Sequence, residues 1–491
     1  MRHNLLHKLG IITLCTALFA ANLFTREKCV YADTDYQAEA EARKSLTIQS
    51  NQIENWPQGP QIGAQGAILM EANTGTILYA KNIDEKLYPA STTKILTALV
   101  AIENAGLDET VTFSHDAVFS IERGSSNMGM DVGQSITMEQ CLYGILVYSA
   151  NEVCNAVGEH IAGSMDNYVA MMNQKAAELG CTNSHFVTTN GLHDENHYTT
   201  PKDLATIACA FFSNDTLSKM AGTNHYYIPP TATQPDEIDL WTHNSLTAGT
   251  YSYDGYIGGK TGFTSDSRQT LVSCAERDGI KLICVVMREE SPNQFLDTIA
   301  LFDYGFNNFQ KVNISENEKN YTINDSDLFN TESDIFFSSD PIINIDTSDS
   351  VIIPKTITFS DLTSSLSYET SNTEGSDSLL ATINYQYHGA DVGSASITLT
   401  PTAPSGQFDS DAVSVSGSLP DDDTKAPASG NVIFINILKV IGIIVLVLIL
   451  IIIAIFAIAF CRNYHFARRR RSRINRKRRR NRRPGNRFDF K

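Results

Sequence analysis

Apolar and polar residues alternate in two pairs of short runs. The first pair lies within residues 66–80 and the second within residues 268–287. Gly66–Glu71 and Thr76–Ala80 form the first pair, and their alternation predicts a β-hairpin. The second pair, 268–276 and 281–287, predicts another hairpin. The chain therefore has strand-forming segments both before and after a long central stretch.

In that central stretch the apolar residues follow a helical period. Within Ser91–Ala105, for example, Ile95, Leu99 and Ile102 share one side of a predicted helix. Further helices are predicted at 137–148, 152–162, 165–179, 201–212 and 292–305. Strands early, helices in the middle and strands late predict an α+β domain over 62–308, whose sheet is completed by both ends of the segment.

The segments on either side of this domain have a different composition. Residues 33–61 are mostly polar and are predicted to be an unstructured lead-in. Residues 309–400 are rich in Ser, Thr, Asp and Asn, and contain short β-prone runs. These runs are Tyr321–Ile323, Ser350–Ile353, Leu379–Tyr387 and Val392–Leu399. We expect 309–400 to form a small all-β domain that resembles a β-sandwich.

The two ends of the chain carry targeting patterns. A short basic start, an apolar run over Leu9–Phe24 and small residues before Asp33 predict a signal peptide over 1–32. Near the other end, Val440–Cys461 has 22 residues without a charge. At 1.5 Å per residue this run spans roughly 33 Å, which suffices for a hydrocarbon core of about 30 Å. We expect one transmembrane helix within 432–461.

Charge supports this topology. The chain carries −17 in total, but 462–491 has 15 Lys and Arg against one acidic residue, so residues 1–461 carry −31. By the positive-inside rule the basic tail, 462–491, is cytoplasmic and the acidic body lies on the other side of the membrane. A Pro-, Ser- and Asp-rich stretch, 401–431, is typical of a flexible stalk. The acidic body argues against nucleic acid as a partner.

Six of the nine cysteines lie between the predicted signal peptide and the membrane segment, and none forms a Cys-x-x-Cys motif. A two-residue turn at Asp278-Gly279 pairs Cys274 with Ile283, so Cys284 points to the opposite face of the sheet. The spacing therefore disfavours a disulfide between Cys274 and Cys284 and predicts free buried thiols.

Ser91-Thr92-Thr93-Lys94 is the first candidate for chemistry. Ser91 and Lys94 lie three residues apart on a predicted helix, so the amine can reach the hydroxyl. A serine becomes a nucleophile only when a neighbour accepts its proton, and a lysine can do so only when burial or a second cation lowers its pKa. Roughly two Ser-x-x-Lys matches occur by chance in a chain of this length, so the alternative is a helix N-cap serine beside an exposed lysine.

Ser149-Ala150-Asn151 is the second candidate, because it interrupts two helical patterns and presents a hydroxyl and an amide from a loop. Its alternative is a simple helix break with an N-cap. Ser125-Ser126-Asn127 has the same spelling, but it lies in a glycine-rich segment that we expect to be an exposed loop. We therefore rank it below Ser149 and Asn151.

Lys260-Thr261-Gly262 is the third candidate. On an edge strand, the Lys260 amine and the Thr261 hydroxyl suit a carboxylate, and Gly262 permits close approach. Lys260 also supplies the second cation that the base requires. The alternative is an edge-strand lysine that only prevents aggregation.

The three motifs occur in one order, with 58 residues from Ser91 to Ser149 and 109 from Asn151 to Lys260. In this order they resemble the signature of penicillin-recognising serine acyl-transferases. Within that superfamily, 62–400 resembles the low-molecular-mass penicillin-binding proteins, the serine-type D-alanyl-D-alanine carboxypeptidases. Tyr88-Pro89-Ala90 before Ser91 and Thr242-His243-Asn244 belong to the same likeness. The sequence departs from the family at Gly258-Gly259, where Asp-Gly and an apolar residue are usual, and at Phe263, where His or Tyr is common.

This resemblance implies a penicillin-binding-protein/β-lactamase-like transpeptidase fold. It implies that Ser91 attacks the peptide bond between two D-alanines of a peptidoglycan stem peptide, that Lys94 takes its proton and that Ser149 relays a proton to the leaving D-alanine. Asn151 would bind the peptide, and Lys260, Thr261 and Gly262 its carboxylate. The backbone N–H groups of Ser91 and Phe263 would form the oxyanion hole. β-Lactam antibiotics would acylate the same serine, and no cofactor is implied.

Three other functions have to be weighed. A class A β-lactamase needs a glutamate after the second motif, and His185–Leu192 contains none in a Glu-x-x-Leu-Asn context. An endopeptidase or transpeptidase differs only in the acceptor and in the bond that is cleaved. A surface scaffold with a vestigial fold is disfavoured because every reacting residue is present. Finally, His193 and His197 have the spacing of a zinc pair, but no third ligand is obvious, so we expect no metal site.

Overall fold

A five-stranded antiparallel sheet forms the centre of the computed structural model, which describes residues 35–319, 343–368 and 378–399. Its strands lie in the order β2-β1-β9-β8-β7. Their bounds are β1 Gly66–Glu71, β2 Ile77–Lys81, β7 Tyr256–Thr264, β8 Arg268–Arg277 and β9 Ile280–Glu289. The first and last strands of the region are thus joined in one sheet, because β1 pairs with β9. Both predicted hairpins are confirmed.

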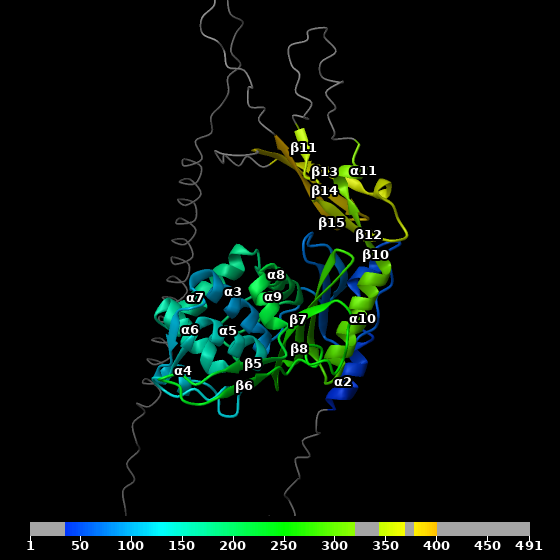
Figure 1. Ribbon diagram of the computed structural model, residues 1–491. Coiled ribbons are helices and arrows are strands. Elements are labelled where there is room, and N and C mark those ends of the chain that lie inside the picture. The colour runs from blue at the N-terminus through cyan, green and yellow to red at the C-terminus, as the bar shows by residue number, and fades with distance from the viewer. Residues whose placement is uncertain (1–34, 320–342, 369–377, 400–491) are drawn as a thin grey trace, which may run out of the picture. The chain divides into compact units, whose positions relative to one another are not determined.

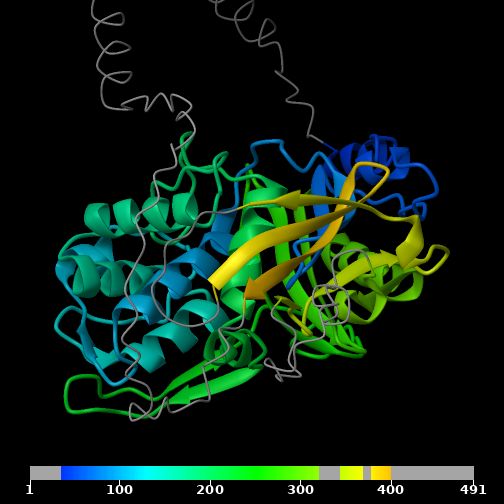
Figure 2. The ribbon, with the colours of Figure 1, turned by 90° about the horizontal axis from the view of Figure 1, so that it is seen from above.

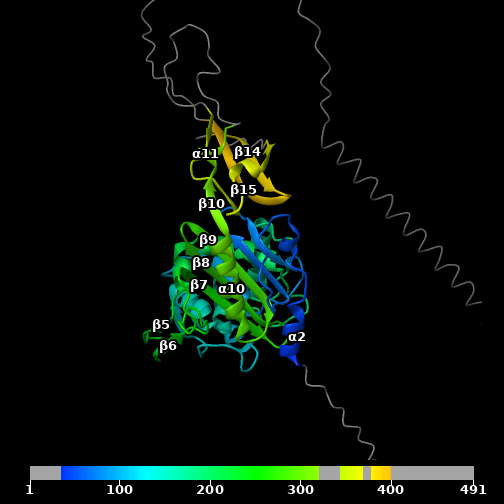
Figure 3. The ribbon, with the colours of Figure 1, turned by 90° about the vertical axis from the view of Figure 1, so that its right-hand side faces the viewer.

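Helices cover both faces of this sheet (Figures 1 and 2). One face packs on a helical layer that contains α3 Lys94–Asn104, α5 Met138–Tyr143, α6 Asn151–Ala162, α7 Met165–Glu178, α8 Pro201–Phe212 and α9 Asp215–Ala221. The other face packs on α10 Asn293–Asn308, which crosses β8 and β9 (Figure 3). The predicted helices are all present, and their apolar stripes form two cores separated by the sheet.

Polar residues set the ends of several helices. Thr137 closes a capping box at the start of α5, Ser164 caps α7, and Thr200 caps α8 ahead of Pro201. After α5 the chain makes a π-helical turn, Gly144–Tyr148, before Ser149. The predicted helix over 137–148 is therefore a regular helix followed by this wider turn.

Smaller elements connect these layers. They are β3 Thr110–Thr112 with β4 Ser135–Thr137, β5 His225–Ile228 with β6 Ile238–Trp241, α4 His115–Phe119, α11 Ile314–Asn317 and the 3-10 turns Gln49–Gln52, Ala90–Thr93 and Phe359–Asp361. The strand pairs β3–β4 and β5–β6 were not among the predicted elements, because their strands have only three or four residues and show little periodicity.

The prediction of an unstructured lead-in is wrong for the described part of 33–61. Residues Tyr36–Arg43 form helix α2, and Trp56 is buried with its indole N–H donating to the Leu78 carbonyl at 2.9 Å. Arg43 Nε also donates to the Gly63 carbonyl at 2.8 Å. The segment is ordered by contacts with residues later in the chain, and its own polar composition gives no sign of them.

A second antiparallel sheet begins directly after α10. Its strands are β10 Phe309–Asn313, β11 Ile343–Ile345, β12 Ser350–Pro354, β13 Thr363–Ser367, β14 Ser378–Tyr387 and β15 Ala390–Leu399. The order is β10-β12-β15-β14-β13, and β11 also pairs with β15. At the bridge between Val351 and Gly393, a Cβ on Gly393 would lie 2.6 Å from the Ser350 carbonyl oxygen, so this crossing requires glycine.

The described strands form one sheet rather than the two facing sheets of the expected sandwich. The reason lies in what covers them. Trp56 contacts Phe309 at a ring-centroid distance of 5.1 Å and Tyr387 at 6.5 Å, so the N-terminal segment supplies part of the apolar cover. The predicted strand Tyr321–Ile323 lies outside the described residues.

Cys274 and Cys284 lie in the two different cores, on opposite faces of the sheet. Cys274 pairs with Ile283 and Cys284 with Ser273, which confirms the predicted register. Within the described ranges all six cysteines are free thiols.

Among the residues described, no helix combines the length and the apolar character that crossing a membrane requires. The signal peptide over 1–32, the stalk over 401–431, the membrane segment over 432–461 and the tail over 462–491 all lie outside those residues. These four stay predictions.

Candidate active site

Ser91 lies in a tight 3-10 turn, Ala90–Thr93, that leads directly into α3. The Lys94 Nζ atom lies 2.9 Å from the Ser91 Oγ atom. Ala90, just before the serine, has φ +50°, a conformation that costs a non-glycine residue energy. The backbone is therefore strained where the candidate nucleophile is presented.

Lys94 is fully buried and has three oxygen neighbours. Besides Ser91 Oγ, the amine lies 2.6 Å from the Asn151 side-chain oxygen and 2.6 Å from the Asn190 backbone carbonyl. Both of these oxygens can only accept. A neutral amine has two N–H donors and one lone pair, so two donors can satisfy the carbonyl oxygens while the lone pair faces the serine hydroxyl. The surroundings of Lys94 thus suit a proton acceptor.

Burial lowers the pKa of Lys94 to about 8, with smaller opposing effects from Cys154 and Glu152. Roughly a tenth of this amine is therefore neutral at pH 7, whereas an exposed lysine, with a pKa near 10.4, is almost wholly charged. Ser91 and Lys94 can work as a nucleophile and its base only if the pKa of Lys94 is lowered in this way.

Lys260 is also buried, and its Nζ lies 3.0 Å from Ser149 Oγ and 2.8 Å from the Thr261 carbonyl oxygen. Burial lowers the pKa of Lys260 well below its usual value, and repulsion from Lys94 lowers it further. The two amines are thus close enough to interact. Burial is the larger cause at Lys260 and the sole lowering cause at Lys94, whereas the sequence predicted that Lys260 would help to lower the pKa of Lys94.

Ser149 has φ +68° and ψ +30°, the left-handed helical region. It stands between the π-helical turn and α6, whose first residue is Asn151. This break directs the Ser149 hydroxyl to Lys260 and the Asn151 amide to Lys94. One short bend therefore serves both amines.

The strand β7 lies at the edge of the sheet and carries Lys260, Thr261 and Gly262. A Cβ on Gly262 would lie 2.9 Å from the Ser91 backbone nitrogen and 3.0 Å from the Pro89 carbonyl oxygen, too close for any other residue. The Thr270 hydroxyl on β8 donates to the same Pro89 carbonyl at 2.9 Å. Glycine thus lets the strand lie against the turn that holds Ser91, with Phe263 following directly. The oxyanion-hole role of the Ser91 and Phe263 N–H groups stays a prediction.

A cavity of about 470 Å³ opens beside these residues. Its walls include Ser91, Ser149, Asn151, Thr261, Gly262 and Phe263. The structure therefore brings the three motifs of the sequence together around one space. Phe263 is 53% exposed at this site, so its ring is free to contact a bound molecule.

The segment around Ser125-Ser126 also lines this cavity, although we ranked it low. The Asn151 N–H donates to the Ser126 carbonyl at 2.9 Å, and the Met128 N–H donates to the Glu152 carboxylate at 2.7 Å. The loop is thus held against the start of α6, which lies far from it in sequence. Its glycines at 124, 129 and 133 all have positive φ. These glycines were the one signal in the sequence that the loop has a defined conformation.

Asn190 was missed because its contribution is a backbone carbonyl, which any residue type could supply. Its neighbour Gly191 has φ +83°, and a Cβ there would lie 1.9 Å from the Ala90 carbonyl oxygen. Glycine is therefore required for this segment to reach the base of the Ser91 turn.

His197 does not resemble a metal ligand in this structure. Its Nδ1 accepts from the Val187 N–H at 3.0 Å, and its Nε2 lies 2.9 Å from the Thr93 hydroxyl. Burial lowers the pKa of His197 to about 4, so the ring is neutral and both of its nitrogens have protein partners. His193 instead packs edge-on against Tyr88.

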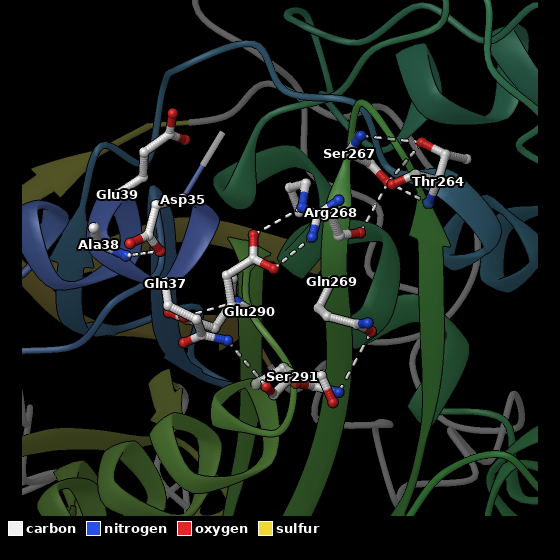
Figure 4. Close-up of polar contacts among 12 residues, drawn as sticks. Asp35, Gln37, Ala38, Glu39, Thr264, Ser267, Arg268, Gln269, Glu290 and Ser291 are labelled. Atoms are coloured by element: carbon white, nitrogen blue, oxygen red, sulfur yellow. Dashed lines mark hydrogen bonds and ion pairs between the residues drawn. The ribbon is translucent and has the colours of Figure 1, made fainter. Parts of the chain in front are cut away.

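One wall of the cavity is backed by a largely buried ion pair between Arg268 and Glu290 (Figure 4). The Arg268 guanidinium donates to both carboxylate oxygens of Glu290, at 2.8 and 2.7 Å. Ser267 Oγ accepts from the Thr264 N–H at 2.8 Å and so closes the turn between β7 and β8. Gln269 and Ser291, next to the ion pair in the chain, line the cavity.

Helix α2 supports this wall. Its Tyr36 ring lies 3.8 Å from the Arg268 guanidinium, and the Phe263 ring lies 5.5 Å from the same group. Gln37 also donates to the Ser291 carbonyl at 3.4 Å (Figure 4). The N-terminal segment is therefore part of the surroundings of the site.

Comparison with known proteins points to one family. The sequence profile described as D-alanyl-D-alanine carboxypeptidase matches residues 53–291. The D-alanyl-D-alanine carboxypeptidase DacB2 of Mycobacterium tuberculosis is 32% identical over 256 residues, which cover 51% of this chain and 84% of that protein. DacF of Bacillus subtilis is 31% identical over 252 residues, 50% of this chain and 63% of that protein.

A solved structure shares the fold beyond the matched region. Penicillin-binding protein 5 of Haemophilus influenzae has a TM-score of 0.55 and 25% identity, and the likeness covers 70% of this chain and 98% of that one. The α+β architecture, with helices on both faces of the sheet, therefore agrees with the fold implied by the three motifs.

Proposed function

Because this chain belongs to the D-alanyl-D-alanine carboxypeptidase family, we propose that it removes the terminal D-alanine from peptidoglycan stem pentapeptides through an acyl-enzyme on Ser91. The observation that carries this proposal is that Ser91 and Ser149 line one cavity and each lies within 3.0 Å of a buried amine, Lys94 and Lys260 respectively. The match to DacF spans 63% of that relative, so the activity is argued from this chain's own residues.

In the first step Ser91 Oγ attacks the carbonyl carbon between the two D-alanines, and Lys94 Nζ takes the hydroxyl proton. The distance of 2.9 Å between the two atoms permits direct transfer. The backbone N–H groups of Ser91 and Phe263 stabilise the oxyanion, and one such donor contributes about 3–4 kcal/mol to transition-state stability.

Lys260 and Thr261 bind the substrate's terminal carboxylate. That negative charge favours the protonated form of Lys260, and the positive charge on Lys260 in turn disfavours a charge on Lys94. Substrate binding thus keeps Lys94 in the neutral form that the first step needs.

The tetrahedral intermediate then collapses. The C–N bond breaks, and the nitrogen of the leaving D-alanine receives a proton from the Ser149 hydroxyl. The proton that Lys94 took from Ser91 replaces it, so Lys94 is neutral again, while Lys260 Nζ holds the Ser149 hydroxyl at 3.0 Å. Water attacks the ester carbonyl, releases the shortened peptide and restores Ser91. A β-lactam acylates Ser91 by the same first step, and opening of its ring takes the place of the leaving D-alanine.

The same geometry would serve an endopeptidase or a transpeptidase, in which the acceptor or the cleaved bond differs. The family match favours the carboxypeptidase. A scaffold without activity is disfavoured, because the pKa of Lys94 is lowered at the one position where a base is needed.

The proposal is tested by treating the protein with penicillin and locating the adduct by mass spectrometry. We expect the adduct on the peptide that contains Ser91, no adduct on Ser91→Ala, and release of D-alanine from a pentapeptide by the unsubstituted protein alone. An adduct elsewhere, or equal labelling of both proteins, contradicts the assignment.

We also propose that the protein is exported and held at the bacterial cytoplasmic membrane with the catalytic domain outside. The signal-peptide pattern over 1–32, the uncharged run Val440–Cys461 and the basic tail support this topology. Protease added to intact cells should remove the catalytic domain but leave the tail intact. Recovery of the whole chain in the soluble fraction of lysed cells contradicts the anchor.

A further inference from the structure

The hairpin β5–β6 exposes two large aromatic side chains on one face. Trp241 is 56% exposed and Tyr227 is 43% exposed. His225 pairs with Trp241 and Tyr227 with Asp239, so these four side chains alternate onto the same side of the two strands. We call this face, made of His225, Tyr227, Asp239 and Trp241, the aromatic platform.

The opposite face of the hairpin fixes the platform in place. Tyr226 stacks on Tyr143 of α5, with ring centroids 3.6 Å apart and planes inclined by only 7°. Ile228 and Leu240 are buried on the same side. The platform is therefore presented by a hairpin that is packed on the domain, and its exposure does not reflect a loose chain.

The chemistry of the platform is that of a flat apolar surface edged with polar groups. The His225 ring lies 4.2 Å from the Trp241 ring, and its Nε2 lies 2.8 Å from the Asp239 carboxylate. A pyranose ring has an apolar face of C–H groups and an edge of hydroxyls, so it can pack on such rings while it hydrogen-bonds to the polar pair. Because Trp241 and Tyr227 stand on one face of the same hairpin, they offer a shared binding surface that scattered single side chains would not.

The position of the platform links it to the active site. Strand β6 ends at Trp241, and two residues later His243 lines the catalytic cavity. Tyr227 lies opposite Asp239, which is four residues before His243, so at about 3.3 Å per residue Asp239 lies within roughly 13 Å of this cavity-lining residue. A molecule that leaves the cavity along β6 passes over Trp241 first and Tyr227 next.

We propose that the aromatic platform binds the glycan strand to which the stem peptide in the cavity is attached. The proposal rests on the proposed function, because it assumes that the cavity holds a stem peptide. The glycan carries the sugar rings that suit the platform, and it is covalently continuous with the peptide.

The two tryptophans of the chain make the binding directly measurable. Trp56 is 3% exposed, so a ligand on the surface changes chiefly the fluorescence of Trp241. We would titrate the protein with soluble glycan strands from which the peptides have been removed. The expected result is a saturable change in tryptophan fluorescence.

Substitution separates the platform from other surfaces. Tyr227→Ala leaves the Trp241 reporter in place and should weaken glycan binding about five- to tenfold, the order expected for one aromatic contact. Phe119→Ala is the matched control, because Phe119 is 66% exposed and also packs beside a histidine, His115. This control should bind glycan like the unsubstituted protein.

An activity measurement forms the second arm. Trp241→Ala should lower kcat/KM for uncross-linked glycan strands that carry pentapeptides. This loss should be about five- to tenfold larger than the loss for the free pentapeptide, and it should appear as a higher KM. Trp241→Phe should recover part of the difference, because it restores an aromatic ring.

The two proposals fail in different ways. If the free pentapeptide is not hydrolysed, the proposed function fails, and glycan binding is still read from fluorescence. If peptide-free glycan produces no change, or if Tyr227→Ala and Phe119→Ala bind equally, the glycan platform is ruled out. If tryptophan fluorescence changes with phosphatidylglycerol vesicles but not with glycan, the platform binds a membrane. If the fluorescence changes with protein concentration alone, the platform binds a second copy of this chain. Either result overturns the proposal.

Discussion

At the scale of single residues, the site depends on two buried amines whose charges are controlled by their surroundings. Lys94 has two acceptors and one hydroxyl around its nitrogen, and Lys260 has one hydroxyl and one carbonyl. Burial removes water from both and lowers the pKa of each. The chemistry therefore depends on whether Lys94 is neutral when the substrate arrives.

Acylation should accordingly rise with pH. The pKa of Lys94 is lowered to about 8, so its neutral, proton-accepting form increases as the pH rises through that value. We expect the rate of acylation by penicillin to increase between about pH 6.5 and 9, with its midpoint near 8. Stopped-flow measurement of acylation at constant ionic strength provides the test. A rate that is flat or falls over this range would show that Lys94 is not the base.

Gly262 is the second residue on which the site depends. In Gly262→Ala the new methyl group would lie 2.4 Å from the Thr270 hydroxyl oxygen and 2.9 Å from the Ser91 nitrogen, so β7 must move away from the turn. We expect acylation to slow by about 10²–10³, the cost of losing an oxyanion-hole donor.

The control for this substitution is Gly106→Ala. Gly106 lies away from the cavity, and a Cβ there meets a side-chain oxygen of Asp108 at 3.1 Å. The Gly106→Ala protein should be acylated by penicillin at the same rate as the unsubstituted protein. Equal rates for Gly262→Ala and the unsubstituted protein would mean that the close approach of β7 has no role in the reaction.

At the scale of elements, helices and strands that are far apart in sequence share the work of positioning. The turn before α3 presents Ser91, the bend before α6 presents Ser149 and Asn151, and β7 presents Lys260. The ion pair between Arg268 and Glu290 joins the start of β8 to the end of β9 behind the cavity wall. Because both side chains are largely buried, loss of one partner leaves the other without compensation.

We expect Glu290→Gln to lower the free energy of unfolding by about 2 kcal/mol, because two hydrogen bonds to a carboxylate are replaced by one from the charged guanidinium to a neutral amide oxygen. Urea denaturation measures the change. Glu276→Gln is the control, since Glu276 is exposed and lies 3.8 Å from a half-buried Lys281, and its effect should stay within about 0.5 kcal/mol. If Glu290→Gln is as stable as this control, the two hydrogen bonds between Arg268 and Glu290 do not stabilise the fold.

At the scale of the whole molecule, Trp56 connects three parts of the described structure. It contacts the second sheet through Phe309 and Tyr387 and donates to Leu78 in β2 of the central sheet. One side chain from the N-terminal segment thus packs between the two sheets.

Trp56→Ala should lower the free energy of unfolding by about 3–5 kcal/mol, the usual cost of removing a buried aromatic ring. Trp56→Phe should lower it less. Trp241→Ala, at an exposed position, should change stability by no more than about 0.5 kcal/mol. Urea denaturation followed by circular dichroism compares the three. An effect of Trp56→Ala no larger than that of Trp241→Ala would show that Trp56 does not hold these parts together.

The sequence by itself determined the six predicted helices, the two predicted hairpins and the order of the three motifs, because each depends on residues that are neighbours in the chain. A period of two or of about 3.6 is a local property, and so is the spacing between Ser91 and Lys94. The register that separates Cys274 from Cys284 could be predicted for the same reason.

Only the tertiary structure decided which of these segments meet. The Asn190 carbonyl, the loop around Ser126, the order of α2 and the burial of Trp56 all depend on partners far away in the chain. Polar composition describes how a segment would behave alone in water, whereas a contact with a distant residue can bury the same segment. The lowered pKa of Lys94 follows the same logic, because it arises from the exclusion of water by packing that no local motif specifies.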